Sequence, residues 1–221
     1  QFTTFKRNAA ELLGRELRLG QIIYCSPLVD PYQPVEARER AMPDLLQTLI
    51  AHPPRRFVIQ IRGPLILRDL DLLAQLAQAT ELRVSFSLTT NRDEIRRAYE
   101  PHCAPHAERL DAIAALTAKG IQVHATLAPI LPSDLEILIA DACRVTSGAA
   151  LIADPAHNRD TKKHGATTRD AALRIARHRN EGQWFESEFQ RELTVRMQAI
   201  AASHGRLLGI GAQGFRALVT D

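Results

Sequence analysis

The most informative boundary between a predicted helix and a predicted strand lies in residues 120–132, Gly-Ile-Gln-Val-His-Ala-Thr-Leu-Ala-Pro-Ile-Leu-Pro. Gly120 follows a stretch with helical spacing of apolar residues over 108–119, and it predicts the end of that helix. The apolar run after it predicts a buried strand over 121–130. Ser133, with Glu136 three residues later, predicts the cap of a further helix that reaches Cys143.

The same alternation of helix and strand extends in both directions from this stretch. Short apolar runs predict four more strands, over 21–25, 57–61, 82–88 and 149–153. Helical spacing predicts helices over 9–19, 38–51, 67–77, about 168–179 and 188–203, followed by a short tail over 207–220. Asn91, with Glu94 three residues later, predicts the cap of another short helix. Five strand–helix units in alternation indicate a parallel sheet with right-handed crossovers.

Two architectures are compatible with this pattern, an open doubly wound sheet and part of a (β/α) barrel. In both of them the functional residues gather at the carboxyl ends of the strands. The 221 residues are 45% hydrophobic and 24% charged, with a formal net charge of +3, which is typical of one larger globular domain. The sequence has no apolar run near the ~18 residues of a membrane span and no secretory signal, so we expect a cytoplasmic protein without membrane contact.

The residues at and around the predicted strand ends carry a family resemblance. In chain order they are 30–36 (Asp-Pro-Tyr-Gln-Pro-Val-Glu), 65–73, 85–90, Glu100-Pro101, Ala104-Pro105, Arg109-Leu110, 120–123 and 128–132. This series resembles the radical S-adenosylmethionine (radical SAM) proteins of the spore-photoproduct-lyase-like, "DNA repair photolyase" group, over roughly residues 8–155. The resemblance implies a partial TIM barrel in which SAM lies across the strand ends beside a [4Fe–4S] cluster. Here about five units would be present and the first strand missing, with residues 156–221 as a basic loop and a helical C-terminal extension on the same domain.

The resemblance also implies roles for individual residues. The family's basic residue at the end of its second strand here falls on Arg62, which would bind the methionine carboxylate. Ser87, with Thr89 beside it, falls on the position that contacts the ribose or the carboxylate, and the turn with Pro129 on the stretch that packs against adenine. Asp30 completes the expected cofactor-binding set. Glu100 and Arg109 resemble the family's buried ion pair, with a structural role.

The cysteines depart from the family pattern. Family members carry Cys-x3-Cys-x2-Cys after the first strand, whereas Cys25, Cys103 and Cys143 form no such motif and no metal-binding pair. We therefore expect the cluster segment to lie upstream of Gln1 or not to exist, and the chain as given to be inactive. Cys25 is a catalytic candidate because a cysteine on this strand donates hydrogen in the family. The ungapped count from Asp30 places that position on Pro27, which favours a buried packing role for Cys25.

Two further motifs lie in the C-terminal third. Residues 156–180 hold seven basic side chains against two acidic ones, and Arg159, Lys162 and Lys163 directly follow the last predicted strand. They are candidate nucleic-acid contacts, with a solvated helix face and loop as the equally weighted alternative. The glycines at 209, 211 and 214 match a dinucleotide-binding spacing, but too few residues follow for a βαβ unit, so we expect a glycine-rich turn into a terminal strand.

Two hypotheses of function follow. The first is a radical SAM enzyme, lyase-like, that cleaves SAM at a [4Fe–4S] cluster, with damaged DNA as a substrate and an electron donor such as flavodoxin or ferredoxin. The second is a cluster-less barrel that binds nucleotide or nucleic acid, and the altered Ile61-Arg62-Gly63 segment favours it. A monomer and a homodimer are both compatible with the sequence.

Overall fold

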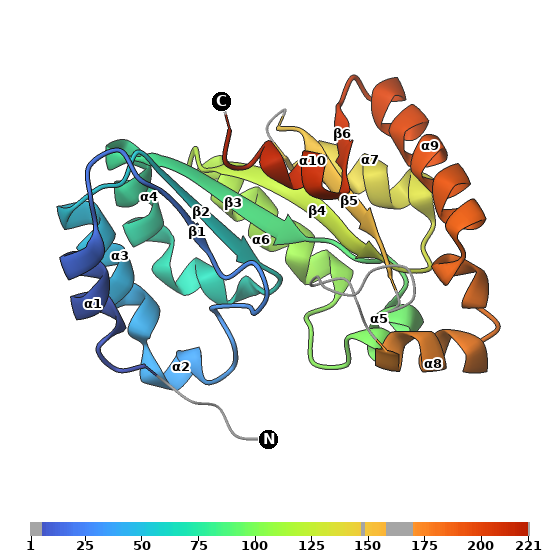
Figure 1. Cartoon of the computed structure of the whole chain (residues 1–221), viewed down its shortest axis with the longest axis horizontal. Helices are drawn as coiled ribbons and strands as arrows, with labels where there is room; N and C mark the ends of the chain where they lie inside the picture. The colour runs from blue at the N-terminus through green and yellow to red at the C-terminus, as the bar shows by residue number, and fades with distance from the viewer. Residues whose placement is uncertain (1–5, 147–148, 158–169, 221) are drawn as a thin grey trace.

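A computed structural model describes residues 6–146, 149–157 and 170–220. Within these residues a sheet of six parallel strands runs in the order β1-β2-β3-β4-β5-β6, with helices between successive strands (Figure 1). The strands are β1 Ile22–Cys25, β2 Arg56–Ile61, β3 Glu81–Ser87, β4 Gln122–Ile130, β5 Leu151–Pro155 and β6 Leu208–Ile210. The sheet is open, so the expected α/β class and parallel alternation are confirmed, while the expected number of five strands is wrong by one.

The helices follow the strands in a regular succession. Their bounds are α1 Ala9–Glu16, α2 Glu36–Glu39, α3 Ala41–Ala51, α4 Leu70–Ala79, α5 Asp93–Tyr99, α6 His106–Ala118, α7 Leu135–Val145, α8 Asp170–His178, α9 Ser187–Ser203 and α10 Gly211–Arg216. Two 3₁₀ turns, η1 Pro64–Asp69 and η2 Gly182–Phe185, precede α4 and α9. No helix in the described part of the chain is long and apolar enough to cross a membrane.

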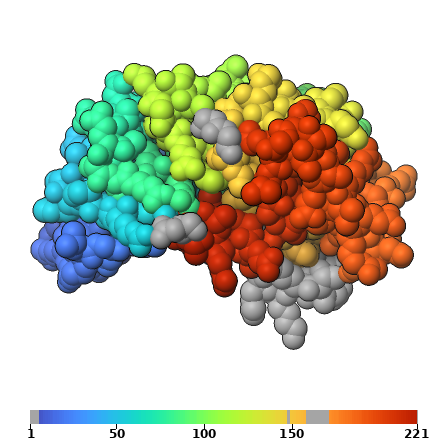
Figure 2. Space-filling model, turned by 90° about the horizontal axis from the view of Figure 1, so that it is seen from above, coloured from blue at the N-terminus to red at the C-terminus, as the bar shows by residue number. Residues whose placement is uncertain are grey.

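The two faces of the sheet have different coverings. On β3, Val84 and Phe86 belong to the main core, together with apolar residues of α3, α4, α6, α7 and α9. Strand alternation turns Ser85 and Ser87 to the other, inner face, where Ser85 Oγ lies 2.6 Å from Thr126 Oγ1 of β4. This inner face is covered by the C-terminal residues, since Leu218 packs with Val58 and Ile152. In Figure 2 the red C-terminal residues lie between the blue-to-green first half and the orange α9.

The glycine-rich tail corrects one expectation. A Cβ atom on Gly209 would lie only 2.6 Å from Cα of Gly214, so β6 and α10 touch through their backbones and both positions require glycine. Gly209 therefore lies in a strand, and Gly211 and Gly214 lie in the helix that follows it, the reverse of the expected turn into a terminal strand. This connection lets α10 fold back against β5 and the inner face of the sheet.

The helix expected over 38–51 is two helices, because the chain turns at Arg40, where φ is +51°. The buried carboxylate of Glu36 accepts hydrogen bonds from the backbone N–H groups of Ala41 (3.1 Å) and Met42 (2.9 Å). These N–H groups begin α3 and have no partner within that helix, so the carboxylate caps it from α2. The remaining predicted helices begin or end at other residues than the observed ones. For example, the helix expected over 9–19 ends at Glu16.

Candidate functional site

Two adjoining chambers lie at the carboxyl ends of β1 to β5 in the described structure. The first, here called the β1-side chamber, has a volume of about 480 Å³. The second, here called the α8 chamber, has a volume of about 280 Å³. Both are lined by Arg62, Pro101, His102 and Cys103, so these residues form the boundary between them. Parallel sheets gather functional residues at this edge, and the chambers lie where the sequence predicted the site.

Arg62 follows β2 and is held in place by a buried ionic network. Its Nη1 lies 3.5 Å from Oε1 of Glu100, and the side chain is 24% exposed, so part of the guanidinium remains available to a ligand. The other Glu100 oxygen, Oε2, accepts hydrogen bonds from Arg109 Nη2 (2.9 Å) and Thr89 Oγ1 (2.7 Å). Burial alone would raise the pKa of Glu100, but Arg109, Thr89 and Arg62 together hold that pKa below its ordinary value.

Thr89 and Ser87 have different surroundings, although the sequence placed them together. The hydroxyl of Thr89 is fully buried and donates to Glu100, so it supports the ion pair. Ser87 is also fully buried, yet its Oγ has no hydrogen-bond partner among the described residues. A buried hydroxyl without a partner costs free energy, so a ligand or a water molecule that bonds to it would be favoured.

Asp30 joins the loop after β1 to the end of β2. Its Oδ1 accepts from the backbone N–H of Tyr32 (2.8 Å) and its Oδ2 from the backbone N–H of Arg62 (2.9 Å). Burial raises the pKa of Asp30, and these two hydrogen bonds oppose that effect. The carboxylate thereby fixes the backbone of Arg62 and lines the β1-side chamber.

Pro129 lines the α8 chamber, as do Leu131, Tyr99 and residues of α8. The Ala128–Pro129 peptide bond is cis. Leu131 donates its backbone N–H to the Thr89 carbonyl (3.0 Å), and Thr90 Oγ1 donates to the Pro132 carbonyl (2.7 Å). The turn after β4 is therefore attached to the end of β3 and forms a fixed apolar wall.

The three cysteines lie apart from one another. Cys25 packs against the main core with Ile23, while Tyr24 between them faces the inner side with Val58. Burial raises the pKa of the Cys25 thiol, which agrees with a packing role, and its catalytic role remains a prediction. Cys103 lines both chambers beside Arg62, and sequence reasoning assigned it no role. Within the described residues no group of three His, Cys, Asp or Glu side chains could hold a metal ion.

Arg159, Lys162 and Lys163 lie outside the described residues, so their predicted nucleic-acid contacts remain predictions. The neighbouring α8 adds Arg174 and Arg177, which are exposed. Neither forms an ion pair with a described residue, whereas Arg96 and Arg97 on α5 both pair with Asp93. The exposed side of α8 thus carries positive charge that described acidic residues do not neutralise.

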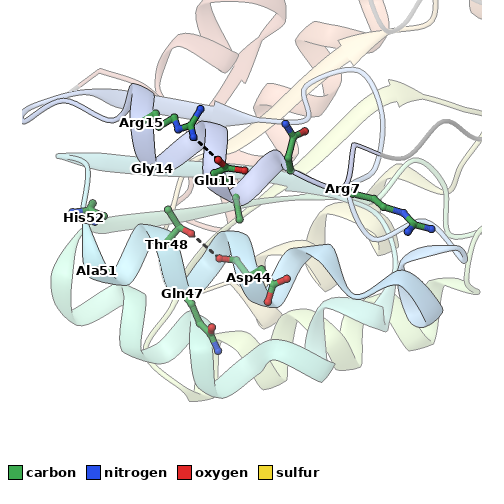
Figure 3. A pocket seen from close by; sticks show the side chains of 11 residues that line it. Arg7, Glu11, Gly14, Arg15, Asp44, Gln47, Thr48, Ala51 and His52 are labelled. Carbon is green, nitrogen blue, oxygen red and sulfur yellow. Dashed lines mark hydrogen bonds and ion pairs between the residues drawn. The ribbon is translucent and has the colours of Figure 1, made fainter.

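A third hollow, between α1 and α3, has none of the predicted site residues (Figure 3). It is a broad depression of about 790 Å³ in which Arg15 pairs with Glu11 (2.5 Å) and Thr48 Oγ1 donates to the Asp44 carbonyl (2.9 Å). It lies on the helix layer, away from the carboxyl ends of the strands. The strand-end chambers are therefore the candidate site.

Comparisons with known proteins found uncharacterized sequence relatives and solved structures of similar fold. No family model matches the sequence. An uncharacterized protein of Mycobacterium tuberculosis (strain ATCC 25618 / H37Rv) is 33% identical over 131 residues, 58% of this chain and 38% of that protein. An uncharacterized protein of Methanocaldococcus jannaschii is 25% identical over 138 residues, 62% of this chain and 51% of that protein. The chain thus spans about two fifths to one half of these relatives.

Solved structures of spore photoproduct lyase, a radical SAM enzyme, resemble this fold. The enzyme complexed with dinucleoside spore photoproduct matches with a TM-score of 0.61 and 13% identity, over 91% of this chain and 64% of that one. A mutant of the same enzyme with bound AdoMet and dinucleoside spore photoproduct matches with a TM-score of 0.60 and 13% identity, over 91% and 64% of the two chains. At this identity the likeness shows a shared α/β fold and no more.

Proposed function

We propose that this chain forms the SAM-binding part of a radical SAM enzyme of the spore-photoproduct-lyase-like group. The observation that carries the proposal is the partly exposed guanidinium of Arg62 at the boundary of two chambers, one of which has an apolar wall around Pro129. A nucleoside that carries an amino acid has one flat, weakly polar end and one carboxylate end. The chambers and the guanidinium offer matching surfaces side by side.

The residues present fit such a ligand. Arg62 would bind the carboxylate through two parallel N–H···O bonds, with Glu100 holding the guanidinium from behind. The turn at Pro129 would cover the adenine face. Ser87 lines neither chamber and is fully buried, so the ribose or carboxylate contact that the resemblance implies for it needs a shift of the neighbouring side chains. Bound SAM would supply a sulfonium carbon–sulfur bond that can be cleaved reductively. The residues around the two chambers bind and orient it and exclude water.

The [4Fe–4S] cluster does not fit the described residues. Cys25, Cys103 and Cys143 lie on β1, in the loop before α6 and on α7, and none belongs to a three-ligand group. We derive no catalytic step through a cluster on these residues. Radical chemistry on damaged DNA, an electron donor such as flavodoxin or ferredoxin, and inactivity of this chain by itself all remain parts of the proposal.

The test is isothermal titration calorimetry with two stable ligands. S-adenosylhomocysteine carries the carboxylate, and 5′-methylthioadenosine lacks the whole amino-acid part. Arg62→Ala should weaken S-adenosylhomocysteine binding about 10- to 100-fold, because charge-assisted hydrogen bonds contribute about 1.5–3 kcal/mol. Binding of 5′-methylthioadenosine should not change, and Arg97→Ala, an exposed arginine on α5, should change neither. Equal losses for both ligands, or no binding by the unaltered chain, would contradict the proposal.

A second candidate function is a nucleic-acid binding module. The uncompensated Arg174 and Arg177 on α8 favour it, beside the predicted contacts of Arg159, Lys162 and Lys163. DNA binding should weaken steeply with salt, and the log–log salt slope should decrease by about 0.9 in duplex DNA, or about 0.7 in single strands, for each phosphate that is no longer neutralised. The variant Lys162→Ala/Lys163→Ala should reduce that slope. An unchanged slope would exclude binding of phosphates by these two lysines.

A further inference from the structure

The helix α8 forms one complete side of the α8 chamber. Ala171, Ala172 and Ile175 line it, and their spacing along the helix places them on one helical face. This helix comes after the strand–helix alternation of β1 to β5, so a segment outside that repeat closes the site. Pro129 and Leu131 from the end of β4 also line the chamber and are here called its strand side.

The two sides of the chamber are held by different interactions. Leu131 is bonded through its backbone to Thr89 of the sheet edge, so its position depends little on any one side chain. In contrast, α8 packs through Ala172 and Ala176 against Phe185, in a small cluster separate from the main core. The shape of the α8 side is therefore determined by a few side chains of α8 itself.

The size of the chamber makes these side chains decisive. Its volume of about 280 Å³ is just below the ~300–1,000 Å³ range of small-molecule pockets. Two alanines leave space along the helix, and Ile175 is the largest α8 side chain that projects into it. A longer side chain at Ala172 would reduce this volume, and a shorter one at Ile175 would enlarge it.

We infer that α8 determines which nucleoside the site accepts, with Ala172 and Ile175 as its specificity-determining residues. The inference rests on the proposed function, since it takes the ligand of this chamber to be a nucleoside. It adds that selectivity is set by the C-terminal segment, while Arg62 and Glu100 recognise the carboxylate. The substrate class is a purine nucleoside without a bulky substituent on the edge that faces α8.

The experiment compares S-adenosylhomocysteine with three derivatives that carry a benzyl group at N6, C2 or C8 of the adenine. Ile175→Ala should improve the affinity for at least one derivative, relative to the parent compound, by 10-fold or more, because single methylene groups in apolar pockets discriminate about 10- to 200-fold. Ala172→Leu should weaken the parent compound at least 10-fold.

The matched control is Leu173→Ala on the same helix. Leu173 packs against the Phe185 cluster and does not line the chamber, so its truncation lowers the stability of α8 without changing the chamber. Its selectivity should equal that of the unaltered chain. If Ile175→Ala and Leu173→Ala behave alike, or no derivative gains, α8 does not set selectivity although the proposed function stands. If the unaltered chain binds none of the four compounds, both the proposed function and this inference fail.

Discussion

The two sides of the α8 chamber differ in how they are built. On the strand side, Arg109 and Glu100 form an ion pair whose side chains are only 2% and 9% exposed, and Glu100 also contacts Arg62 at the boundary of the two chambers. On the helix side, α8 packs mainly through alanines against Phe185. Buried charges are costly to disturb, whereas small apolar contacts are not. The molecule thus combines a fixed electrostatic anchor with a side whose shape can change at small cost to stability.

The largest effect is expected from breaking the ion pair with Arg109→Leu. This change leaves the buried carboxylate of Glu100 with the Thr89 hydroxyl and the 3.5 Å contact to Arg62. It also removes the hydrogen bond to the Ala104 carbonyl (2.8 Å). Removing one partner of a buried pair typically costs about 3–5 kcal/mol, so the free energy of unfolding in urea should fall by about that amount.

Arg97→Leu is the control for Arg109→Leu, because Arg97 is 65% exposed in its pair with Asp93. Exposed pairs contribute about 0–1 kcal/mol, and the control should stay within that range. The variant Arg109→Leu/Glu100→Leu should recover part of the loss, since no unpaired charge is then left. If Arg97→Leu and Arg109→Leu lose equal amounts of unfolding free energy, the buried ion pair is not the fixed anchor described above.

Sequence patterns predicted the sheet well because the first five strands are apolar runs between helices. They missed β6, since Leu208-Gly209-Ile210 is short and contains a glycine that strands usually disfavour. That glycine is explained only by the contact with Gly214, which no local pattern contains. A tertiary contact therefore decided the structure of the tail.

Capping signals show the same limit. Asn91 was predicted to cap a helix, but its side chain bonds to the backbone of Asp134, and α5 begins at Asp93. Asp134, not Ser133, accepts from the Ile137 N–H (3.2 Å) and caps α7. Both Asn91 and Thr90 found partners in a neighbouring loop, 43 and 42 positions away along the sequence. Spacing along the chain cannot show such partners.

The candidate site was predicted in part. Arg62 lines both chambers, and Pro129 and Asp30 line one each, as strand-end positions should. Ser87 and Thr89 were also predicted for the site but line neither chamber. The link from Glu100 to Arg62 was not foreseen, because it joins two loops that only the folded sheet brings together. The α8 side was also missed, since nothing in residues 170–178 shows that their alanines face a chamber.

Low pH should reduce the contribution of the buried Glu100 ion pair, on the strand side, to the free energy of unfolding. Burial would raise the pKa of Glu100, but Arg109, Thr89 and Arg62 hold it below its ordinary value, so the ionised carboxylate stabilises the fold. This contribution is complete above the pKa of Glu100 in the unfolded chain and is lost as the pH falls through the lowered folded pKa. Urea unfolding of the unaltered chain and Glu100→Gln between pH 7 and pH 3 should show a stability difference that shrinks on acidification. This change in stability should be smaller than the loss of unfolding free energy in Arg109→Leu. If the unfolding free energies of the unaltered chain and Glu100→Gln run parallel as the pH falls, the prediction is contradicted.

Overpacking the helix side should have a smaller and local effect. Ala176 is fully buried beside Phe185, and a leucine there would force the cluster apart at a cost of about 1–3 kcal/mol. Because this cluster is separate from the main core, α8 should open while the sheet stays folded. Hydrogen exchange should be faster in α8 of Ala176→Leu and unchanged in β3. Faster exchange in both would show that the two sides form one cooperative unit.

The smallest effect is expected from Tyr99→Phe, which removes one hydrogen bond between α5 and the segment that follows α8. The Tyr99 hydroxyl on α5 donates to Oε2 of Glu181 (2.9 Å), just after α8, and burial raises the pKa of Tyr99 above its ordinary value. Loss of this bond should cost about 0.5–1.5 kcal/mol, confined to the docking of α8. The rate of hydrogen exchange in α8 should rise about 2- to 10-fold, with no change in β3. The free energy of unfolding in urea should fall by no more than the cost of this hydrogen bond. Glu181→Gln retains an acceptor for the Tyr99 hydroxyl but removes the ion pair with Arg179 (3.1 Å). It should give a smaller increase, and an equal or larger increase would show that this ion pair, not the hydrogen bond to Tyr99, controls how α8 is attached.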